Sequence, residues 1–206
     1  MKIYFTRHCE SQANVLNVAS TRGLRHGLTL KGRQQALALA ERLQGLSITH
    51  IYSSPVLRAI ETTVLLANEL AVDYEVVEAL REYDCGIIEG RSDDEAWRLW
   101  RELFDAWLRD KEWERRIEGG ESFYDVQNRF IPFIDELVQQ YQDTDTNLLC
   151  VGHGGIYWMM IPMVLKNIDV SYVVERQGFH YGTLITAEVG PEGLVCRKWD
   201  DDEFGV

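Results

Sequence analysis

The opening stretch Ile3-Tyr4-Phe5-Thr6-Arg7-His8 places an arginine and a histidine directly after a short apolar run. The run Ile3–Thr6 predicts a buried strand, and a second apolar run, Asn147–Val151, ends in Gly152-His153-Gly154. In an open α/β sheet, functional residues gather where the parallel strands end. Two histidines and an arginine in this position predict a site for phosphate chemistry.

Strands and helical segments alternate along the chain. Helices are predicted from about Thr29 to Leu43, with Thr29 as the cap, and from about Pro55 to Leu70, with Ser54 as the cap. Two more are predicted after the capping pair Ser122 and Asp125 and from about Gly155 to Lys166. The other expected strands are Ile48–Tyr52, Tyr74–Val77, Thr183–Val189 and Leu194–Trp199. This alternation favours an α/β fold, namely a three-layer α/β/α sandwich with a mainly parallel sheet.

The segment Asp93–Ile117 departs from this pattern because it is dense in charge and tryptophan. Its aromatic residues fall at helical spacing, which predicts an amphipathic helix. We therefore expect a single domain over residues 1–206 with a helical, lid-like insertion at about 92–118.

Composition limits the partners of the chain. With 206 residues and 46% hydrophobic residues, it can bury a sizeable core, and its net charge of −12 argues against binding to nucleic acid or to an anionic membrane. The four cysteines are scattered without a CxxC pair, and neither a signal peptide nor an apolar run of membrane-spanning length is present. We expect a cytoplasmic protein with reduced thiols, and the sequence leaves an oligomer open.

An anionic substrate must then be held by a local basic pocket. Arg7, Arg58 in the first turn of its helix, and His153 can supply the donors, while Gly154 lets the backbone approach the anion closely. The two glycines after His153 can also begin a helix whose backbone amides face the anion. No metal is expected, since arginines repel a cation and the histidines and cysteines lack metal-ligand spacing. Among the other histidines, His26 and His180 are the two that could border the site.

Six ordered blocks of sequence match one known family. They are Arg7–Ser11; Leu28–Ala36; Ser53–Pro55 with Arg58, Ala59 and Thr62; Leu80–Glu82 with Gly86, Glu89 and Gly90; Gly119–Ser122; and Gly152–Gly154. Together they resemble the histidine phosphatase superfamily, whose members look like cofactor-dependent phosphoglycerate mutase. The resemblance covers most of the chain and implies a phosphoglycerate mutase-like fold.

The resemblance also implies a role for each matching residue. His8 would be the nucleophile that is transiently phosphorylated, and Glu82 would protonate the leaving oxygen. Arg7, Arg58 and His153 would hold the phosphoryl oxygens, and Asn14 falls where many members place a phosphate contact. The family normally has glycine after the nucleophile, where this chain has Cys9. A positive φ there would cost about 1 kcal/mol for a residue with a Cβ. We expect the Cys9 side chain to point away from the site rather than to act as a rival nucleophile.

In the resembling family the insertion varies and shapes the substrate pocket, so two sets of its side chains are candidates for substrate contact. The aromatic set would take an apolar leaving group, and the arginines would take a second anionic group; the sequence does not determine which set faces inward. A helix that only packs on the domain is the third interpretation. The aromatic set is Trp97, Trp100, Phe104, Trp107 and Trp113, and the arginine set is Arg98, Arg101, Arg109, Arg115 and Arg116.

These observations predict an enzyme of the histidine acid-type phosphatases. It would be a metal-independent phosphomonoester hydrolase, without a cofactor, that acts through a phosphohistidine on a small phosphorylated metabolite. A phosphoglycerate mutase is the first alternative, and a non-catalytic phospho-ligand binding protein is the second. The Gly119–Ser122 block and the apparent shortness of the stretch between Glu82 and His153 favour the phosphatase branch.

Overall fold

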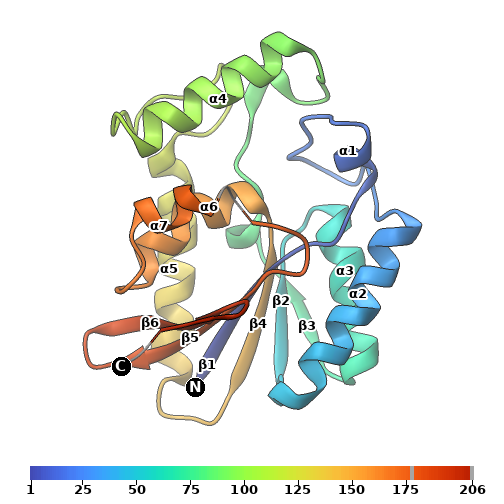
Figure 1. Cartoon of the computed structure of the whole chain (residues 1–206), viewed down its shortest axis with the longest axis vertical. Helices are drawn as coiled ribbons and strands as arrows, with labels where there is room; N and C mark the ends of the chain where they lie inside the picture. Colours follow the sequence, from blue (N-terminus) through green and yellow to red (C-terminus); the bar gives the residue numbers. More distant parts are fainter. Residues whose placement is uncertain (177–178, 205–206) are drawn as a thin grey trace.

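The computed structural model describes residues 1–176 and 179–204. Within them, one sheet of seven strands has the order β3-β2-β4-β1-β5-β6-β7 (Figure 1). The strands are β1 Lys2–Arg7, β2 His50–Ser53, β3 Tyr74–Val76, β4 Asn147–Gly152, β5 Leu184–Gly190, β6 Gly193–Trp199 and β7 Asp202–Glu203. β1 to β4 form a parallel block, and β5 to β7 extend it antiparallel beyond β1.

Helices cover both faces of this sheet (Figure 1). The α-helices are α1 Gln12–Val15, α2 Leu30–Leu43, α3 Leu57–Leu70, α4 Asp94–Leu108, α5 Phe123–Tyr141, α6 Gly154–Val164 and α7 Val170–Glu175; short 3₁₀ turns occupy Gln44–Leu46, Glu78–Leu80 and Gly86–Ile88. Two predicted caps are confirmed. The Thr29 side chain accepts from Gly32 N at 2.9 Å, and Ser122 and Asp125 form a reciprocal capping box.

Alternate residues of the strands enter different cores. On β1, Ile3 and Phe5 pack with α5 and α6, whereas Tyr4 packs with α2 and α3. On β4, Leu148 and Cys150 belong to the first core, and Leu149 to the second. Such a sheet, buried on both faces, is the middle layer of a sandwich. The predicted three-layer α/β/α fold is confirmed.

The strand register brings the predicted site residues to one edge. Arg7 pairs with Gly152 at the ends of β1 and β4, and His8 N donates to Gly152 O at 3.0 Å. β4 lies between β1 and β2, so β2 is not adjacent to β1. The helix that follows β2, α3, therefore brings Arg58 to the site from the far side of β4. The carboxyl ends of the parallel strands therefore place His8, His153 and the start of α3 together.

One predicted helix start is wrong by two residues. α3 begins at Leu57, not at Pro55, and its N-cap is Val56 rather than Ser54. The Ser54 hydroxyl instead accepts from Val56 N at 3.2 Å and contacts His153 Nε2 at 2.6 Å. Ser54 is thus used in a turn that reaches the site.

The predicted helix of the insertion forms as α4. Asp93 caps it, with its side chain accepting from Ala96 N at 3.1 Å, and the helix lies beyond the carboxyl ends of β1, β2 and β4 (Figure 1). Leu103, Phe104 and Trp107 bury one face of α4 in the core shared with α5 and α6. In the part of the chain that the structure describes, no helix is both long enough and apolar enough to cross a bilayer.

Candidate active site

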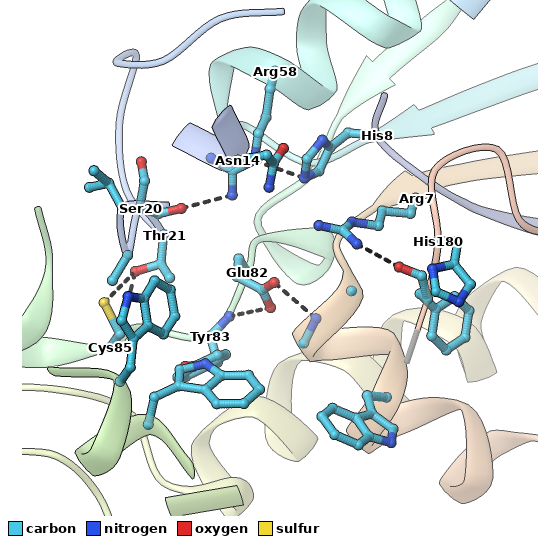
Figure 2. Close-up of a pocket in the computed structure, with 18 residues that line it drawn as sticks. Arg7, His8, Asn14, Ser20, Thr21, Arg58, Glu82, Tyr83, Cys85 and His180 are labelled. Carbon is cyan, nitrogen blue, oxygen red and sulfur yellow. Dashed lines mark hydrogen bonds between the residues drawn. The ribbon is translucent and has the colours of Figure 1, made fainter. Parts of the chain in front are cut away.

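A pocket of about 310 Å³ opens where the parallel strands end (Figure 2). Four of the predicted polar residues, Arg7, His8, Arg58 and Glu82, line it together with Asn14 and Gly154. The other lining residues are Val18, Ala19, Ser20, Thr21, Tyr83, Cys85, Trp97, Trp100, Gly155, Trp158, Phe179 and His180. His180 thus borders the site, which the sequence allowed for it and for His26.

The tautomer of His8 is set by its neighbours. Its Nδ1 lies 2.7 Å from the carbonyl oxygen of Cys9, which can only accept, so Nδ1 carries the proton. Arg58 Nε donates to the other ring nitrogen, Nε2, at 2.9 Å. Nε2 therefore holds a lone pair directed at the guanidinium side of the pocket, which is the arrangement a nitrogen nucleophile needs.

Arg58 is held by contacts with three separate segments of the chain. Besides His8, its Nη2 donates to Ser20 O at 2.8 Å and lies 3.2 Å from His153 Nδ1. His153 Nε2 contacts the Ser54 hydroxyl at 2.6 Å, so both ring nitrogens of this fully buried histidine are occupied. His153 is not among the residues that line the pocket, and its contact with phosphoryl oxygens stays a prediction. In this structure it orients Arg58.

Arg7 is held from the opposite side. Its Nη1 donates to Phe179 O at 2.5 Å, and the Tyr181 ring centroid lies 4.6 Å from its Cζ. Arg7 Nε and Arg58 Nη1 are buried and have no hydrogen-bond partner within the described residues. An unpaired buried N–H is costly, more so on a charged group. Both guanidinium groups thus keep a donor that an anionic oxygen would satisfy.

Burial and charge determine the protonation of this cluster. Burial, reinforced by Arg58 and Arg7, lowers the pKa of His8 well below its usual value, which keeps the imidazole neutral. Burial also lowers the pKa of Arg58 to about 10, which leaves that guanidinium charged near neutral pH. A neutral nucleophile beside fixed positive charge suits attack on a phosphoryl group.

Glu82 is buried against the start of α6. Its Oε1 accepts from Ile156 N at 2.7 Å and Tyr83 N at 3.1 Å, and its Oε2 accepts from Gly155 N at 3.0 Å. The sequence predicts that these amides face the bound anion, but Gly155 and Ile156 instead bind this carboxyl group. A β-carbon at Gly155 would lie 2.7 Å from Oε1, so the glycine is what allows Glu82 to approach.

The pKa of Glu82 is raised by burial, against the opposing effects of Arg58 and the three backbone N–H donors. Oε2 accepts only one N–H and Oε1 accepts two, so Oε2 has the spare capacity to carry a proton. Figure 2 shows this carboxyl group directed into the same pocket as Arg7, Arg58 and His8. A protonated carboxyl group here is positioned to donate.

Asn14 and Gly154 both line the pocket. Asn14 Oδ1 accepts from Ser11 N at 3.0 Å and from the Ser11 hydroxyl at 2.7 Å, which leaves the amide NH₂ as its remaining donor. Gly154 has its Cα next to Arg7, since a Cβ there would lie 3.5 Å from the guanidinium. Both positions therefore suit contact with a bound anion.

Cys9 is accommodated without backbone strain. It does not have a positive φ, and its side chain is buried against Leu28 and Ala36, away from the pocket. Burial raises the pKa of its thiol to about 11. Cys9 is therefore a packing residue and stays a neutral thiol.

The insertion presents aromatic rings to the pocket. Trp97 and Trp100 line it, whereas Phe104 and Trp107 are core residues and Trp113 stacks on Phe123 outside it. The arginines of the insertion are not part of the pocket lining, and four of them pair with carboxylates: Arg98 with Glu102, Arg109 with Asp105, Arg115 with Glu112, and Arg116 with Asp125. Two of the five aromatic candidates therefore line the pocket and none of the five arginines does, while contact of either set with substrate stays a prediction.

Several residues of the site escaped the sequence analysis. Trp158 lies three residues after Gly155 on α6, a helical spacing that places both on one face and that could have identified it. Ser20 and Phe179 act through backbone carbonyls, which carry no sequence signal. Considering residues 1–176 and 179–204 together, no three His, Cys, Asp or Glu side chains converge as metal ligands would.

Comparison with protein families gives one match over nearly the whole chain. The family described as the Histidine phosphatase superfamily (branch 1) matches residues 3–202. The match includes His8, Arg58, Glu82 and His153. It runs from the second residue of β1 to the first residue of β7.

Individual relatives include both phosphatases and mutases. A 6-phosphofructo-2-kinase/fructose-2,6-bisphosphatase from Gallus gallus is 38% identical over 75% of this chain, which spans 30% of that protein. A probable phosphoglycerate mutase from Salmonella choleraesuis is 30% identical over 80% of this chain and 75% of its own length. The structure of a mycobacterial glucosyl-3-phosphoglycerate phosphatase superposes with a TM-score of 0.81 at 25% identity, over 98% of this chain and 99% of the other.

Proposed function

Because the chain belongs to the histidine phosphatase superfamily, we propose that it hydrolyses small phosphomonoesters through a phosphohistidine at His8. The observation that carries this proposal is that His8, Arg7 and Arg58 line the same pocket. His8 Nε2 bears a lone pair, and the two arginines beside it each keep an unpaired buried N–H. A phosphoryl group is the anion that uses both features at once.

In the first half-reaction, His8 Nε2 attacks phosphorus and forms the N–P bond. The bond between phosphorus and the leaving oxygen breaks, and Glu82 transfers a proton to that oxygen, so a neutral alcohol leaves. Arg7 and Arg58 stabilise the charge on the phosphoryl oxygens during transfer. For this attack, Arg58 Nε must release His8 Nε2 and donate to the phosphoryl group instead. The hydrogen bond from Arg58 Nη2 to Ser20 O keeps the guanidinium at the site during this change.

In the second half-reaction, water attacks the phosphorylated His8. The Glu82 carboxylate accepts a proton from that water, the N–P bond breaks, and orthophosphate leaves. His8 returns to the neutral form with its proton on Nδ1, and Glu82 returns to its protonated form. The same carboxyl group therefore acts as acid and then as base.

The substrate proposed at this level is a small phosphorylated metabolite. The relatives named above act, by their descriptions, on fructose 2,6-bisphosphate, phosphoglycerate or glucosyl-3-phosphoglycerate. These substrates share a phosphate ester on an aliphatic alcohol, a poor leaving group that needs protonation.

The test of this proposal is phosphate release from several phosphomonoesters by the purified chain, with and without EDTA. We expect turnover that EDTA does not reduce, because Arg7 and Arg58 supply the charge that a divalent cation supplies in other phosphoryl-transfer enzymes. An enzyme inactivated by EDTA and restored by added metal would contradict the metal-independent mechanism. A non-catalytic phospho-ligand binding protein would release no phosphate in either condition.

The protonation states predict the pH dependence. His8 must be unprotonated, and burial lowers its pKa. After correction for the ionisation of the substrate, kcat/KM should therefore decline on the acid side only at a pH below 6.5. Glu82 must be protonated, and burial raises its pKa, so the alkaline limb lies above pH 4.5. A pH profile of kcat/KM with an alkyl phosphate measures both limbs. An activity that rises only above pH 7 would contradict a neutral His8.

Phosphoglycerate mutase activity is the alternative. A mutase must exclude water from the phosphohistidine and hold a second anionic group. The pocket lining contains Arg7 and Arg58 at the phosphoryl end and indole rings elsewhere, which favours hydrolysis. We expect little or no interconversion of 2- and 3-phosphoglycerate. Efficient interconversion, stimulated by 2,3-bisphosphoglycerate and with negligible phosphate release, would establish the mutase instead.

A further inference from the structure

Three indole rings line the pocket that contains His8. Trp97 and Trp100 come from α4, and Trp158 comes from α6. All three are partly exposed, whereas Leu103 and Phe104 behind them are buried in the core. The three tryptophans are called the indole wall below. An exposed aromatic surface of this kind inside a polar pocket is available to a ligand.

The indole wall is rigidly supported. Phe104 stacks on Trp100 with ring centroids 4.2 Å apart and on Trp158 with centroids 5.2 Å apart. Trp97 packs edge-on against Trp100 at 6.3 Å. Because Phe104 is itself 3% exposed and held in the core, the orientation of two of the indoles is set before any ligand binds. Preorganised rings lose little conformational entropy on binding.

The charged side chains that line the pocket are Arg7, Arg58 and Glu82, and His180 lines it beside Arg7 (Figure 2). Both arginines are engaged at the phosphoryl end, so no arginine or lysine of the pocket lining is left for a second anionic group. Arg22, on the loop before α2, is paired with Asp84 and is not part of the lining. Val18 and Ala19 add apolar surface to the pocket. A carboxylate or second phosphate against the indole wall would be desolvated without a cationic partner.

We propose that the indole wall is a substrate subsite that binds a neutral, planar aromatic group of the leaving alcohol. The substrate class is then a monophosphate ester whose alcohol carries an aromatic ring and no second anionic group. This assignment rests on the proposed phosphatase function for the identity of the reacting group. Binding of the aromatic group itself depends on the indole wall and does not require hydrolysis.

Binding of phosphonates tests the subsite without requiring turnover. The probes are methylphosphonate, 2-naphthylmethylphosphonate and the same naphthyl compound bearing a ring carboxylate, titrated into the full chain by calorimetry. We expect the naphthyl probe to bind at least about tenfold more tightly than methylphosphonate, as stacking on aromatic side chains provides. The added carboxylate should remove most of that gain.

Two variants in different helices locate the effect. Trp100→Leu and Trp158→Leu should each lose most of the naphthyl preference and keep their affinity for methylphosphonate, and the use of two helices guards against one variant failing to fold. Trp113→Leu is the matched control, since it removes an indole of the insertion outside the pocket and should keep the preference. Equal affinity for the methyl and naphthyl probes, or binding of neither, would overturn the subsite.

A parallel hydrolysis assay separates the two proposals. It compares 2-naphthylmethyl phosphate with glycerol 3-phosphate, both esters of poor leaving alcohols. Turnover of both with equal phosphonate affinities would leave the phosphatase standing and remove the subsite. Tight binding of the naphthyl probe without turnover of either ester would support the subsite and defeat the proposed hydrolysis.

Discussion

Replacing His8 by alanine should lower kcat/KM for every phosphomonoester by a factor on the order of 10⁴ or more. The imidazole is the group whose Nε2 lone pair meets the Arg58 guanidinium, and its Nδ1–H is fixed on Cys9 O. No neighbouring side chain can substitute. The pKa of the nearest thiol, Cys9, is raised to about 11, and both nitrogens of His153 are engaged.

His50→Ala is the matched control for this variant. His50 starts β2 at the end of the sheet opposite the site, and its ring packs on Tyr52. It should retain wild-type kcat/KM, and circular dichroism of both variants checks that they fold. Wild-type turnover by folded His8→Ala would remove His8 from the mechanism.

Replacing Glu82 by glutamine should separate substrates by their leaving groups. An amide can still accept N–H bonds at one oxygen but cannot transfer a proton. We expect kcat/KM for an alkyl phosphate to fall by about 10²-fold to 10⁴-fold, the usual contribution of general acid catalysis. For 4-nitrophenyl phosphate, whose nitrophenolate leaves without protonation, the loss should stay below about tenfold.

The quantity to compare is kcat/KM, because it reports steps up to release of the alcohol and not the later hydrolysis of the phosphohistidine. Glu78→Gln provides the control, as the Glu78 side chain is exposed and pairs with Arg81 across one helical turn. An equal loss on both substrates would mean that Glu82 holds α6 in place rather than donating a proton.

The sequence predicted the fold because its strongest signals are local. The apolar runs before Arg7 and Gly152, the Thr29 cap and the Ser122–Asp125 capping box all depend on neighbours within four residues, and each forms as expected. The start of α3 was missed because Ser54 has two competing uses. Its hydroxyl bonds within the turn and to His153, a residue 99 positions away.

The candidate site was predicted less completely, since the missing parts depend on tertiary contacts. Sequence resemblance identified His8, Arg58 and Glu82, but the direction of the Glu82 pKa shift follows from burial and from the donors at the start of α6. The inward face of α4 likewise follows from contact with Phe104 and Trp158. Helical periodicity places residues on a shared face, but it does not say what that face meets.

The most direct measurement of the central proposal is a rapid-quench experiment with radiolabelled 4-nitrophenyl phosphate. A nitrogen nucleophile leaves a phosphoramidate on the protein, which is labile in acid and stable in alkali. Wild-type protein should carry such a label within the first turnover, on the peptide that contains His8, and His8→Ala should carry none. Rapid phosphate release with no trapped label, or label on Cys9 or on a carboxylate, would contradict the phosphohistidine mechanism.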